Sequence, residues 1–306
     1  MKALPLAVAT CLLAGLAASA QEPQTQQVRV RPRPYATAEV PAAAVELPML
    51  EGPLAIVEVR VNGQGPFRFG VDTGAAGGAR ISQTLVDKLG LQAVGQAMTG
   101  DPSGKSRRTI QVFEIDQLKV GDAVFGKVPA AAGDYSAVGV DGILGNGLFS
   151  EYLLTLDYPR RRVRIERGEL PPADNKTILG FEAPQGIPTV HLRLGEVDAE
   201  AHVDSGNSRQ EIVVPASLIP RLKLAAEPVP AGKGRTLFNE FEIQQAPLAG
   251  NLVLGSYELS NPKIDIVDLF PFVNLGHKFL ERFVVTLDVK NHRIRFEPAA
   301  VAGKGA

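Results

Sequence analysis

Two short copies of one motif place a carboxyl group in similar surroundings. Val-Asp-Thr-Gly-Ala occupies residues 71–75 and Val-Asp-Ser-Gly-Asn occupies residues 203–207, so their aspartates are 132 positions apart. In each copy a glycine permits the sharp turn that presents the carboxylate, and a small hydroxyl residue can hydrogen-bond to the opposing copy. The two aspartates and the residues that would support them are Asp72, Thr73, Gly74, Asp204, Ser205 and Gly206.

Two such turns that meet about a two-fold axis would bring Asp72 and Asp204 within hydrogen-bonding distance of each other. Two negative charges that close cannot both form easily, so the pair holds one proton over a wide pH range. One member can then act as a general base on a water molecule, while the other donates a proton to a carbonyl oxygen. The chemistry that this pair indicates is hydrolysis by acid–base catalysis.

The surroundings of the two aspartates are also duplicated. A strand-like apolar run precedes each motif, and a near-identical segment closes each repeat. The closing segments are residues 144–157 with 162–166, and residues 275–288 with 293–297, at a constant offset of 131. Offsets of 131 and 132 differ by a single insertion or deletion, which indicates a duplicated fold unit.

Local patterns predict the elements that position the first aspartate. Residues 56–61 alternate between apolar and polar, and the Asn-Gly-Gln-Gly run at 62–65 is typical of a hairpin turn before the strand that ends at Asp72. Residues 82–90 predict a short helix, with Ser82 as N-cap and Gly90 closing it. A polar, glycine-bracketed run follows at 99–105 and is typical of a hairpin tip. These patterns therefore predict that each repeat forms a unit of six to eight strands with a short helix.

The motifs together make the chain resemble the aspartic proteases of the pepsin and retroviral-protease superfamily. The resemblance rests on the two aspartate turns, on Asp-Gly-Ile-Leu-Gly at 141–145 and on residues 279–288, and it extends over about residues 45–298. It implies an all-β fold in which two homologous, retropepsin-like lobes with short helices flank a cleft. The boundaries that it implies are 44–168 for the first lobe, 169–186 for the connector, 187–298 for the second lobe and 299–306 for a tail.

The same resemblance implies an aspartic endopeptidase that acts on a peptide or protein. Asp72 and Asp204 would be the catalytic pair, and Thr73 and Ser205 would brace the two turns. No metal or other cofactor is implied, and a monomer suffices because one chain carries both aspartates. A flap over the substrate would be formed by Gly100, Asp101, Pro102, Ser103 and Gly104.

Two residues beside the aspartates depart from the pepsin pattern. Ala75 has no hydroxyl to donate to the first carboxylate, which predicts less acidic carboxyls and a pH optimum above pepsin's strongly acid range. Asn207 carries an amide that could donate to Asp204. Asn207 and the polar flap favour an alternative, namely a non-catalytic peptide-binding or scaffolding protein on the same fold, whereas the presence of both aspartates favours the enzyme.

The composition excludes several other classes of protein. Of 306 residues, 45% are hydrophobic and 21% are charged, which fits one or two folded cores. Lys and Arg total 32 against 33 Asp and Glu, so no overall basic field attracts nucleic acid or an anionic membrane. The four histidines show no metal-ligand spacing, and no Gly-x-Ser-x-Gly motif supports a serine hydrolase.

The N-terminal residues have the features of an export signal. A single cation at Lys2, an apolar run and a small-x-small site ending at Ala20 predict cleavage before Gln21. We therefore expect residues 1–20 to be removed and the protein to be periplasmic or secreted, without a stable membrane span. Cys11 lies in this signal, so the mature chain would contain no thiol. Residues 21–43, rich in Pro and Gln, predict a flexible leader that is either a spacer or a propeptide.

Overall fold

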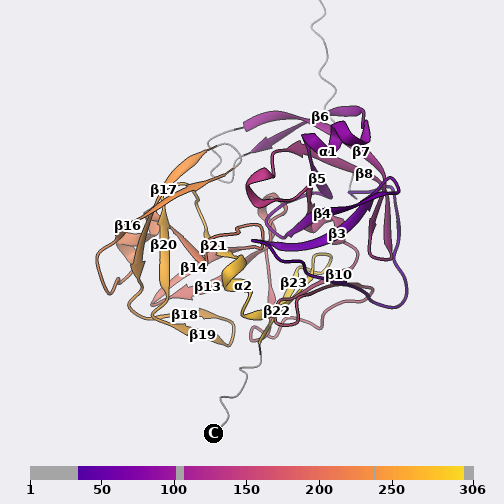
Figure 1. Cartoon of the computed structure of the whole chain (residues 1–306). Coiled ribbons are helices and arrows are strands. Elements are labelled where there is room, and N and C mark those ends of the chain that lie inside the picture. The colour runs from indigo at the N-terminus through magenta and orange to yellow at the C-terminus, as the bar shows by residue number, and fades with distance from the viewer. Residues whose placement is uncertain (1–33, 101–106, 237–238, 300–306) are drawn as a thin grey trace, which may run out of the picture.

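The computed structural model describes residues 34–100, 107–236 and 239–299 (Figure 1). Within these residues the chain forms three β-sheets and two short α-helices, α1 (Gln83–Leu89) and α2 (His277–Leu280). The first repeat builds the lobe drawn in indigo and magenta, and the second builds the lobe drawn in orange (Figure 1). The predicted all-β fold of two homologous lobes is confirmed.

The sheet of the first lobe closes on itself. Its order is β1-β8-β5-β9-β4-β3-β7-β6, and an additional pairing of β7 with β8 joins its two sides into a barrel. The strands are β1 (Thr37–Glu39), β3 (Ala55–Val61), β4 (Gln64–Asp72), β5 (Ala79–Ser82), β6 (Ala93–Gly100), β7 (Arg107–Val120), β8 (Ala123–Gly133) and β9 (Gly142–Gly145).

The sheet of the second lobe has the order β16-β17-β20-β15-β21-β14-β13-β18-β19. Its strands are β13 (Thr189–Leu194), β14 (Val197–Asp204), β15 (Ile212–Pro215), β16 (Val229–Arg235), β17 (Glu240–Pro247), β18 (Asn251–Leu254), β19 (Tyr257–Ser260), β20 (Lys263–Val267) and β21 (Val273–Gly276). Four short strands, β17 to β20, take the place of the two long strands β7 and β8. Pro247 ends β17 and Pro262 precedes β20, and a proline has no N–H to continue a ladder of hydrogen bonds.

A third sheet is shared by the two repeats and lies below the place where the lobes meet (Figure 1). Its order is β12-β23-β22-β10-β11-β2. The strands are β2 (Val45–Pro48), β10 (Leu153–Asp157), β11 (Arg162–Glu166), β12 (Ile178–Gly180), β22 (Phe283–Asp288) and β23 (Arg293–Pro298). Strand β10 pairs with its own duplicate, β22, and Thr155 lies opposite Thr286 with 3.0 Å between their hydroxyl oxygens. Because these threonines are equivalent in the two repeats, the pseudo-two-fold axis passes between them.

One hydrophobic core runs through both lobes and the shared sheet. It includes fully buried aromatic rings from each repeat, among them Phe69, Phe125, Phe279 and Phe283. Full burial of such a side chain contributes about 1.5–3 kcal/mol. A smaller apolar cluster lies beside the first aspartate turn and consists of Leu54, Ile56, Ala75, Tyr135, Val140 and Ile143.

The predicted hairpin and helix of the first repeat are confirmed. Strands β3 and β4 form a hairpin around Asn62 and Gly63, both of which have positive φ. In α1 the Ser82 hydroxyl accepts the N–H of Leu85 at 3.1 Å, and Gly90 closes the helix in the left-handed conformation. After the second aspartate the helix is instead a 3-10 helix, η4 (Ala216–Arg221), with Pro220 inside it.

Two segments predicted as leader and connector are partly built into the sheets. Residues 34–43 are not a flexible leader: β1 pairs with β8, and Tyr35 is buried with its ring 5.3 Å from that of Phe125. The prediction was wrong because it rested on the high Pro and Gln content of the segment and gave no weight to the apolar side chain of Tyr35. In the connector, β12 pairs with β23, and Leu170 donates its N–H to the Asp288 carboxylate at 2.9 Å. The predicted signal peptide, residues 1–20, and residues 21–33 lie outside the described residues.

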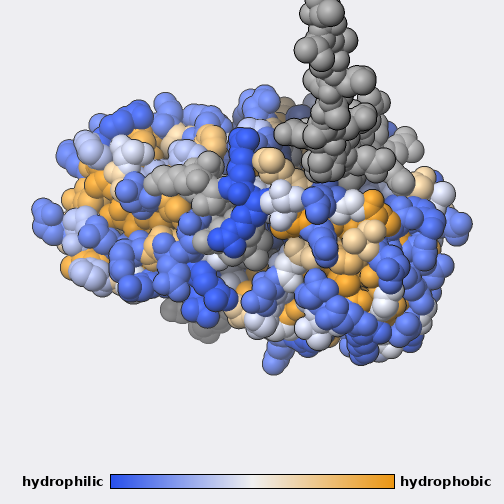
Figure 2. Space-filling model, turned by 90° about the horizontal axis from the view of Figure 1, so that it is seen from above, coloured by the Kyte–Doolittle hydropathy of each residue, from blue (hydrophilic) through white to orange (hydrophobic). Residues whose placement is uncertain are grey.

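The surface seen from above carries a hydrophilic band between two more apolar regions, one over each lobe (Figure 2). Among the described residues, no helix has the length and apolarity needed to cross a bilayer.

Candidate active site

Equivalent strands deliver the two aspartates to the place where the lobes meet. Asp72 is the last residue of β4, which runs parallel to β9, and Asp204 is the last residue of β14, which runs parallel to β21. In both lobes an antiparallel strand, β5 or β15, lies on the other side of that partner. Each aspartate is therefore held where buried strands end and the backbone turns.

The hydroxyl residues after the aspartates hold the two turns together by reciprocal hydrogen bonds. The N–H of Thr73 donates to the Ser205 hydroxyl at 2.9 Å, and the N–H of Ser205 donates to the Thr73 hydroxyl at 3.0 Å. Each hydroxyl also donates across the interface, from Thr73 to the Val203 carbonyl at 2.6 Å and from Ser205 to the Val71 carbonyl at 2.8 Å. Both side chains are buried, so the four bonds are shielded from water.

The glycines of the two turns permit the carboxyl groups to approach. A β-carbon added to Gly74 would collide with the carboxyl of Asp204, and one added to Gly206 would collide with the carboxyl of Asp72. Each carboxyl thus packs against the glycine of the opposite turn. The structure brings all six residues predicted for the pair and its supports into one place.

The segment after β9 supports the first aspartate turn through a buried side-chain amide. Asn146 is buried, and its side-chain amide donates to the Thr73 carbonyl at 2.7 Å and to the Gly186 carbonyl at 2.9 Å. His277 has this position in the second repeat. Its Nε2 lies 3.4 Å from a carboxylate oxygen of Glu281, and its ring meets that of Tyr158 edge-on at 5.1 Å.

The two carboxyl groups differ in their side-chain donors. Backbone N–H groups of Gly206 and Asn207 donate to Oδ1 of Asp204 at 3.0 and 3.1 Å, and that of Gly74 donates to Oδ1 of Asp72 at 2.8 Å. Within the described part of the chain, Asp204 alone also receives a side-chain amide, from Asn274 Nδ2 to Oδ2 at 2.7 Å. The amide of Asn207 does not reach Asp204, contrary to expectation, and donates to Asn274 instead.

The environment of Asp72 favours its protonated form. Burial, followed by the charge of Asp204, raises the pKa of Asp72 to about 7, although Arg80 and the N–H groups of Gly74 and Ala75 act in the opposite direction. A carboxyl that keeps its proton up to neutral pH can serve as a general acid. The site thus combines a proton donor with a second carboxyl that is rich in hydrogen-bond donors.

Comparison with known proteins agrees with this geometry. A family model described as aspartyl protease matches residues 57–148, a segment that contains Asp72 and its turn. The crystal structure of basic 7S globulin from soybean shares the fold with a TM-score of 0.50 at 13% sequence identity, over 87% of this chain and 98% of that chain. The match of residues 57–148 to the aspartyl protease family, together with the shared fold, supports the resemblance to the aspartic protease superfamily. No curated protein sequence matches it.

Two further ionisable groups lie near the pair of aspartates. Burial lowers the pKa of His202, although the Asp204 charge opposes that shift, and the His202 ring packs against Phe272 with centroids 4.7 Å apart. Burial raises the pKa of Tyr158, and the carboxylates of Glu281, Asp204 and Asp72 raise it further, so this phenol keeps its proton.

The predicted flap lies only partly within the described residues. Gly100 ends β6, at the far end of the hairpin that β6 forms with β7. Asp101, Pro102, Ser103 and Gly104 lie outside the described residues. The exposed fractions of Val94 and Met98 on β6 are 55% and 69%.

Two polar residues of this aspartic-protease-like site were missed by sequence reasoning. Asn274 replaces Ile143 of the first repeat, in a segment whose next two residues, Leu-Gly, are identical in both repeats. That single polar substitution was a signal that alignment of the repeats could have found. Arg80, on β5, affects the pKa of Asp72 and had no counterpart in any motif.

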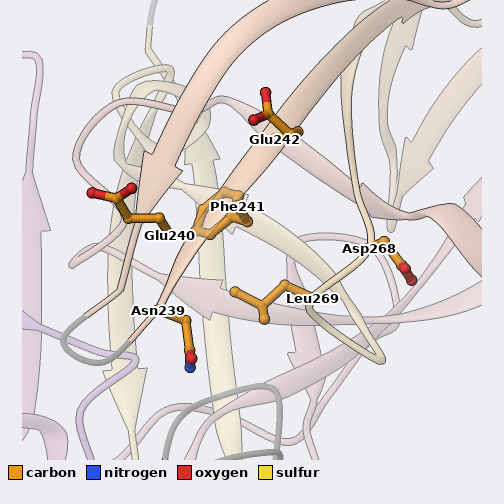
Figure 3. Close-up of a pocket in the computed structure, with 6 residues that line it drawn as sticks. All are labelled: Asn239, Glu240, Phe241, Glu242, Asp268 and Leu269. Atoms are coloured by element: carbon orange, nitrogen blue, oxygen red, sulfur yellow. The ribbon is translucent and has the colours of Figure 1, made fainter.

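A separate pocket lies on the second lobe between β17 and the segment after β20 (Figure 3). None of its lining residues belongs to the two aspartate turns, although three of them carry carboxylates. The six residues are Asn239, Glu240, Phe241, Glu242, Asp268 and Leu269. Lys233 pairs with Glu242 at 3.0 Å, and the rings of Phe241 and Phe270 lie 5.7 Å apart.

Proposed function

We propose that this protein is an aspartic endopeptidase that hydrolyses peptide bonds with a water molecule activated between Asp72 and Asp204. The observation that carries the proposal is the reciprocal bonding of Thr73 and Ser205, which holds both carboxyls at one place. A polar turn without a catalytic role would not need a glycine against the opposite carboxyl in each lobe.

The proposed reaction uses one proton held by two carboxyls. The ionised carboxylate accepts a proton from water as the water oxygen bonds to the peptide carbon, and the protonated carboxyl donates to the carbonyl oxygen. Collapse of the tetrahedral intermediate then breaks the C–N bond: the leaving nitrogen receives a proton from the first carboxyl, and one hydroxyl of the intermediate returns a proton to the second carboxyl. Sharing of one proton between two aspartates is general to the aspartic proteases, and we apply it here to Asp72 and Asp204.

The pKa of Asp72 sets the upper pH limit of this chemistry. With a value of about 7, Asp72 keeps its proton through mildly acidic pH and loses it near neutrality. We therefore expect kcat/KM to fall as pH rises through about 7, and the optimum to lie above about pH 3. A profile with its maximum below that pH would contradict the assignment.

The test is cleavage of a mixed peptide library by the protein that begins at Gln21, between about pH 3 and 7. Asp72→Asn and Asp204→Asn should each lower kcat/KM by about three or more orders of magnitude, because the carboxyls act as a unit. Asp87→Asn is a matched control on the exposed face of α1, where the carboxylate accepts from Gln83, and it should leave the rate unchanged. Activity retained in either dyad variant would refute the proposal.

A non-catalytic peptide-binding or scaffolding protein is the alternative. The soybean structure that shares this fold is named a globulin and not a protease, and a fold does not by itself imply an activity. If the folded protein cleaves no peptide but binds peptides equally well with and without the two carboxyls, the alternative is correct.

We propose in addition that the protein is exported to the periplasm or secreted and acts there as a monomer on peptide or protein substrates. The first twenty residues support export through their cation, apolar run and small-residue site. N-terminal sequencing of the mature protein should give Gln21 as its first residue, and an intact Met1 would contradict export by cleavage.

A further inference from the structure

We propose that Asn274, oriented by Asn207, fixes the negative charge of the carboxyl pair on Asp204, so that Asp204 is the base and Asp72 is the acid. The catalytic meaning of this inference rests on the proposed function. The position of the charge does not, because it can be measured in a protein that cleaves nothing.

A backbone group determines the direction of the hydrogen bonds that end at Asp204. The N–H of Gln210 can only donate, and it faces Oδ1 of Asn207 at 3.4 Å. The Nδ2 of Asn207 must then point the other way, where it donates to Oδ1 of Asn274 at 2.8 Å. That bond in turn leaves Nδ2 of Asn274 to donate to Oδ2 of Asp204 at 2.7 Å. The orientation of each amide is thus fixed by the hydrogen bond that precedes it in this chain of donors.

This chain of donors requires Asp204 to accept. Oδ2 receives the Asn274 amide, and Oδ1 receives the N–H groups of Gly206 and Asn207. Hydrogen bonds to an ionised carboxylate are roughly twice as strong as bonds between neutral groups, so the network favours the ionised form. If Oδ2 of Asp204 carried a proton directed at Asn274, that proton would face the amide hydrogen of Asn274 and be repelled by it.

The first lobe has no counterpart to this network among the described residues. Ala75 stands in the place of Asn207, Ile143 stands in the place of Asn274, and neither side chain can donate. The backbone donors of the two turns are similar, since Gly74 and Ala75 face Asp72 much as Gly206 and Asn207 face Asp204. The side-chain amide is therefore the main difference between the two carboxyls.

Other charged and ionisable groups also lie near the two carboxyls. Arg80 on β5 favours an ionised Asp72, yet burial and the Asp204 charge outweigh it. His202 precedes Asp204 by two residues on β14, and burial lowers its pKa, which favours the neutral imidazole. Tyr158, and Tyr135 beside Arg80, keep their protons because burial raises the pKa of each phenol. Arg80 is therefore the cation that opposes the assignment, and it sits on the Asp72 side.

With the charge so placed, each proton has a defined route. Water gives a proton to Asp204 as its oxygen bonds to the carbonyl carbon, and the carbonyl oxygen takes the proton of Asp72. In the second step Asp204 passes its proton to the leaving nitrogen as the C–N bond breaks, and one hydroxyl of the intermediate returns a proton to Asp72. The enzyme ends in its initial state, with Asp72 protonated and Asp204 ionised.

The first measurement is a carbon-13 NMR titration of the aspartate carboxyl carbons in the full-length mature protein. Asp72→Asn and Asp204→Asn identify the two signals. We expect the signal that titrates at lower pH to be that of Asp204, and to be absent from Asp204→Asn. Assignment of the lower step to Asp72 would overturn the inference, whether or not the protein cleaves peptides.

The second measurement uses Asn274→Ile, which gives the second lobe the residue of the first. Loss of the charge-assisted bond should raise the pH of the lower titration step, and of the acidic limb of kcat/KM, by about one unit. Asn207→Ala removes only the orienting group and should give a smaller shift of the same sign. Circular dichroism verifies folding, and if Asn274→Ile does not fold, Asn207→Ala decides. An unchanged titration in the folded variants would refute the role of Asn274.

Failure of this inference differs from failure of the proposed function. A protein that cleaves no peptide but titrates first at Asp204 keeps the charge assignment and loses the activity. A protein that cleaves peptides through both aspartates but titrates first at Asp72 keeps the activity and loses the assignment.

Discussion

The turn at Asp72 and the turn at Asp204 share a backbone but differ in the charges that they favour. The residues that shape and brace the two turns, Thr73 with Gly74 and Ser205 with Gly206, are nearly the same and make reciprocal bonds. The residues beside the carboxyls are apolar in one lobe and amides in the other. Geometry is thus constrained in both copies, while the proton affinity of each carboxyl is set by neighbours that are free to diverge.

The largest expected effect on stability comes from the buried charge of Asp72. Its folded-state pKa of about 7 lies above the usual 3.8, so the folded protein binds more protons than the unfolded chain between these values. Stability is therefore fully present below about pH 4 and falls by a few kcal/mol as pH rises to about 7. Asp72→Asn should remove most of this dependence.

Urea unfolding at three pH values across that range measures the slope. Asp204→Asn serves as the comparison: it removes the charge that contributes to the raised pKa of Asp72, so its slope should be shallower than that of the parent but not zero. Equal slopes in the parent and in Asp72→Asn would show that the charge of Asp72 is not buried at a cost.

The hydroxyls of Thr73 and Ser205 should contribute equally to stability, in contrast to the two carboxyls, whose surroundings differ. Thr73→Val and Ser205→Ala each leave one buried N–H and one buried carbonyl without a partner, so each should cost about 2–4 kcal/mol. Thr189→Val is a control, because that hydroxyl donates to the nearby Ile187 carbonyl and does not join the lobes. Urea unfolding at one pH compares the three variants. If the losses of unfolding free energy in Thr73→Val and Ser205→Ala differed by more than about 1 kcal/mol, the two hydroxyls would not contribute equally to stability.

Asn146 and His277 occupy equivalent positions in the two repeats, and we expect their substitution to lower stability by different, smaller amounts. Asn146→Ala leaves the carbonyls of Thr73 and Gly186 without this donor and should cost about 2 kcal/mol. His277→Asn should cost about 1 kcal/mol or less, since the buried Nδ1 of His277 has no hydrogen-bond partner among the described residues and little hydrogen bonding is lost. Thermal unfolding of both variants provides the comparison, and a reversed order would contradict it.

The smallest effect is expected on the pseudo-two-fold axis. Thr155→Val or Thr286→Val removes one neutral hydrogen bond and should cost about 1 kcal/mol. Thr286→Val should cost slightly more, because Arg295 also donates to that hydroxyl at 3.3 Å. The double variant should cost less than the two single variants together, since no hydroxyl is left facing an apolar neighbour. Strict additivity in chemical unfolding would argue against direct pairing.

Sequence alone predicted the features that depend on local chemistry. The aspartate turns, the hairpin at Asn62 and the helix from Ser82 to Gly90 were predictable because glycine, asparagine and serine have specific backbone roles. The duplication then predicted two lobes and two carboxyls at one place. The reciprocal bonds of Thr73 and Ser205 follow from the same symmetry.

Features that depend on distant partners were not predictable in this way. The bond from Asn274 to Asp204 joins residues 70 positions apart, and no property of either segment specifies it. The strand at Thr37–Glu39 lies in a segment whose composition resembles a flexible chain, and only its pairing with β8 makes it a strand. Asp101 to Gly104 lie outside the described residues, and their assignment to a flap stays a prediction.

Two contacts between the repeats lie on the pseudo-two-fold axis. The pair Thr73 with Ser205 and the pair Thr155 with Thr286 each exchange partners under the pseudo-two-fold operation, so the axis runs midway through both. This line is the axis about which one repeat would rotate against the other. One lobe can rotate against the other about it with the least disturbance of these bonds, and points near the line move least. A displacement of one repeat that preserves both pairs of bonds therefore leaves the two aspartate turns nearly in place, while residues far from this line move the most.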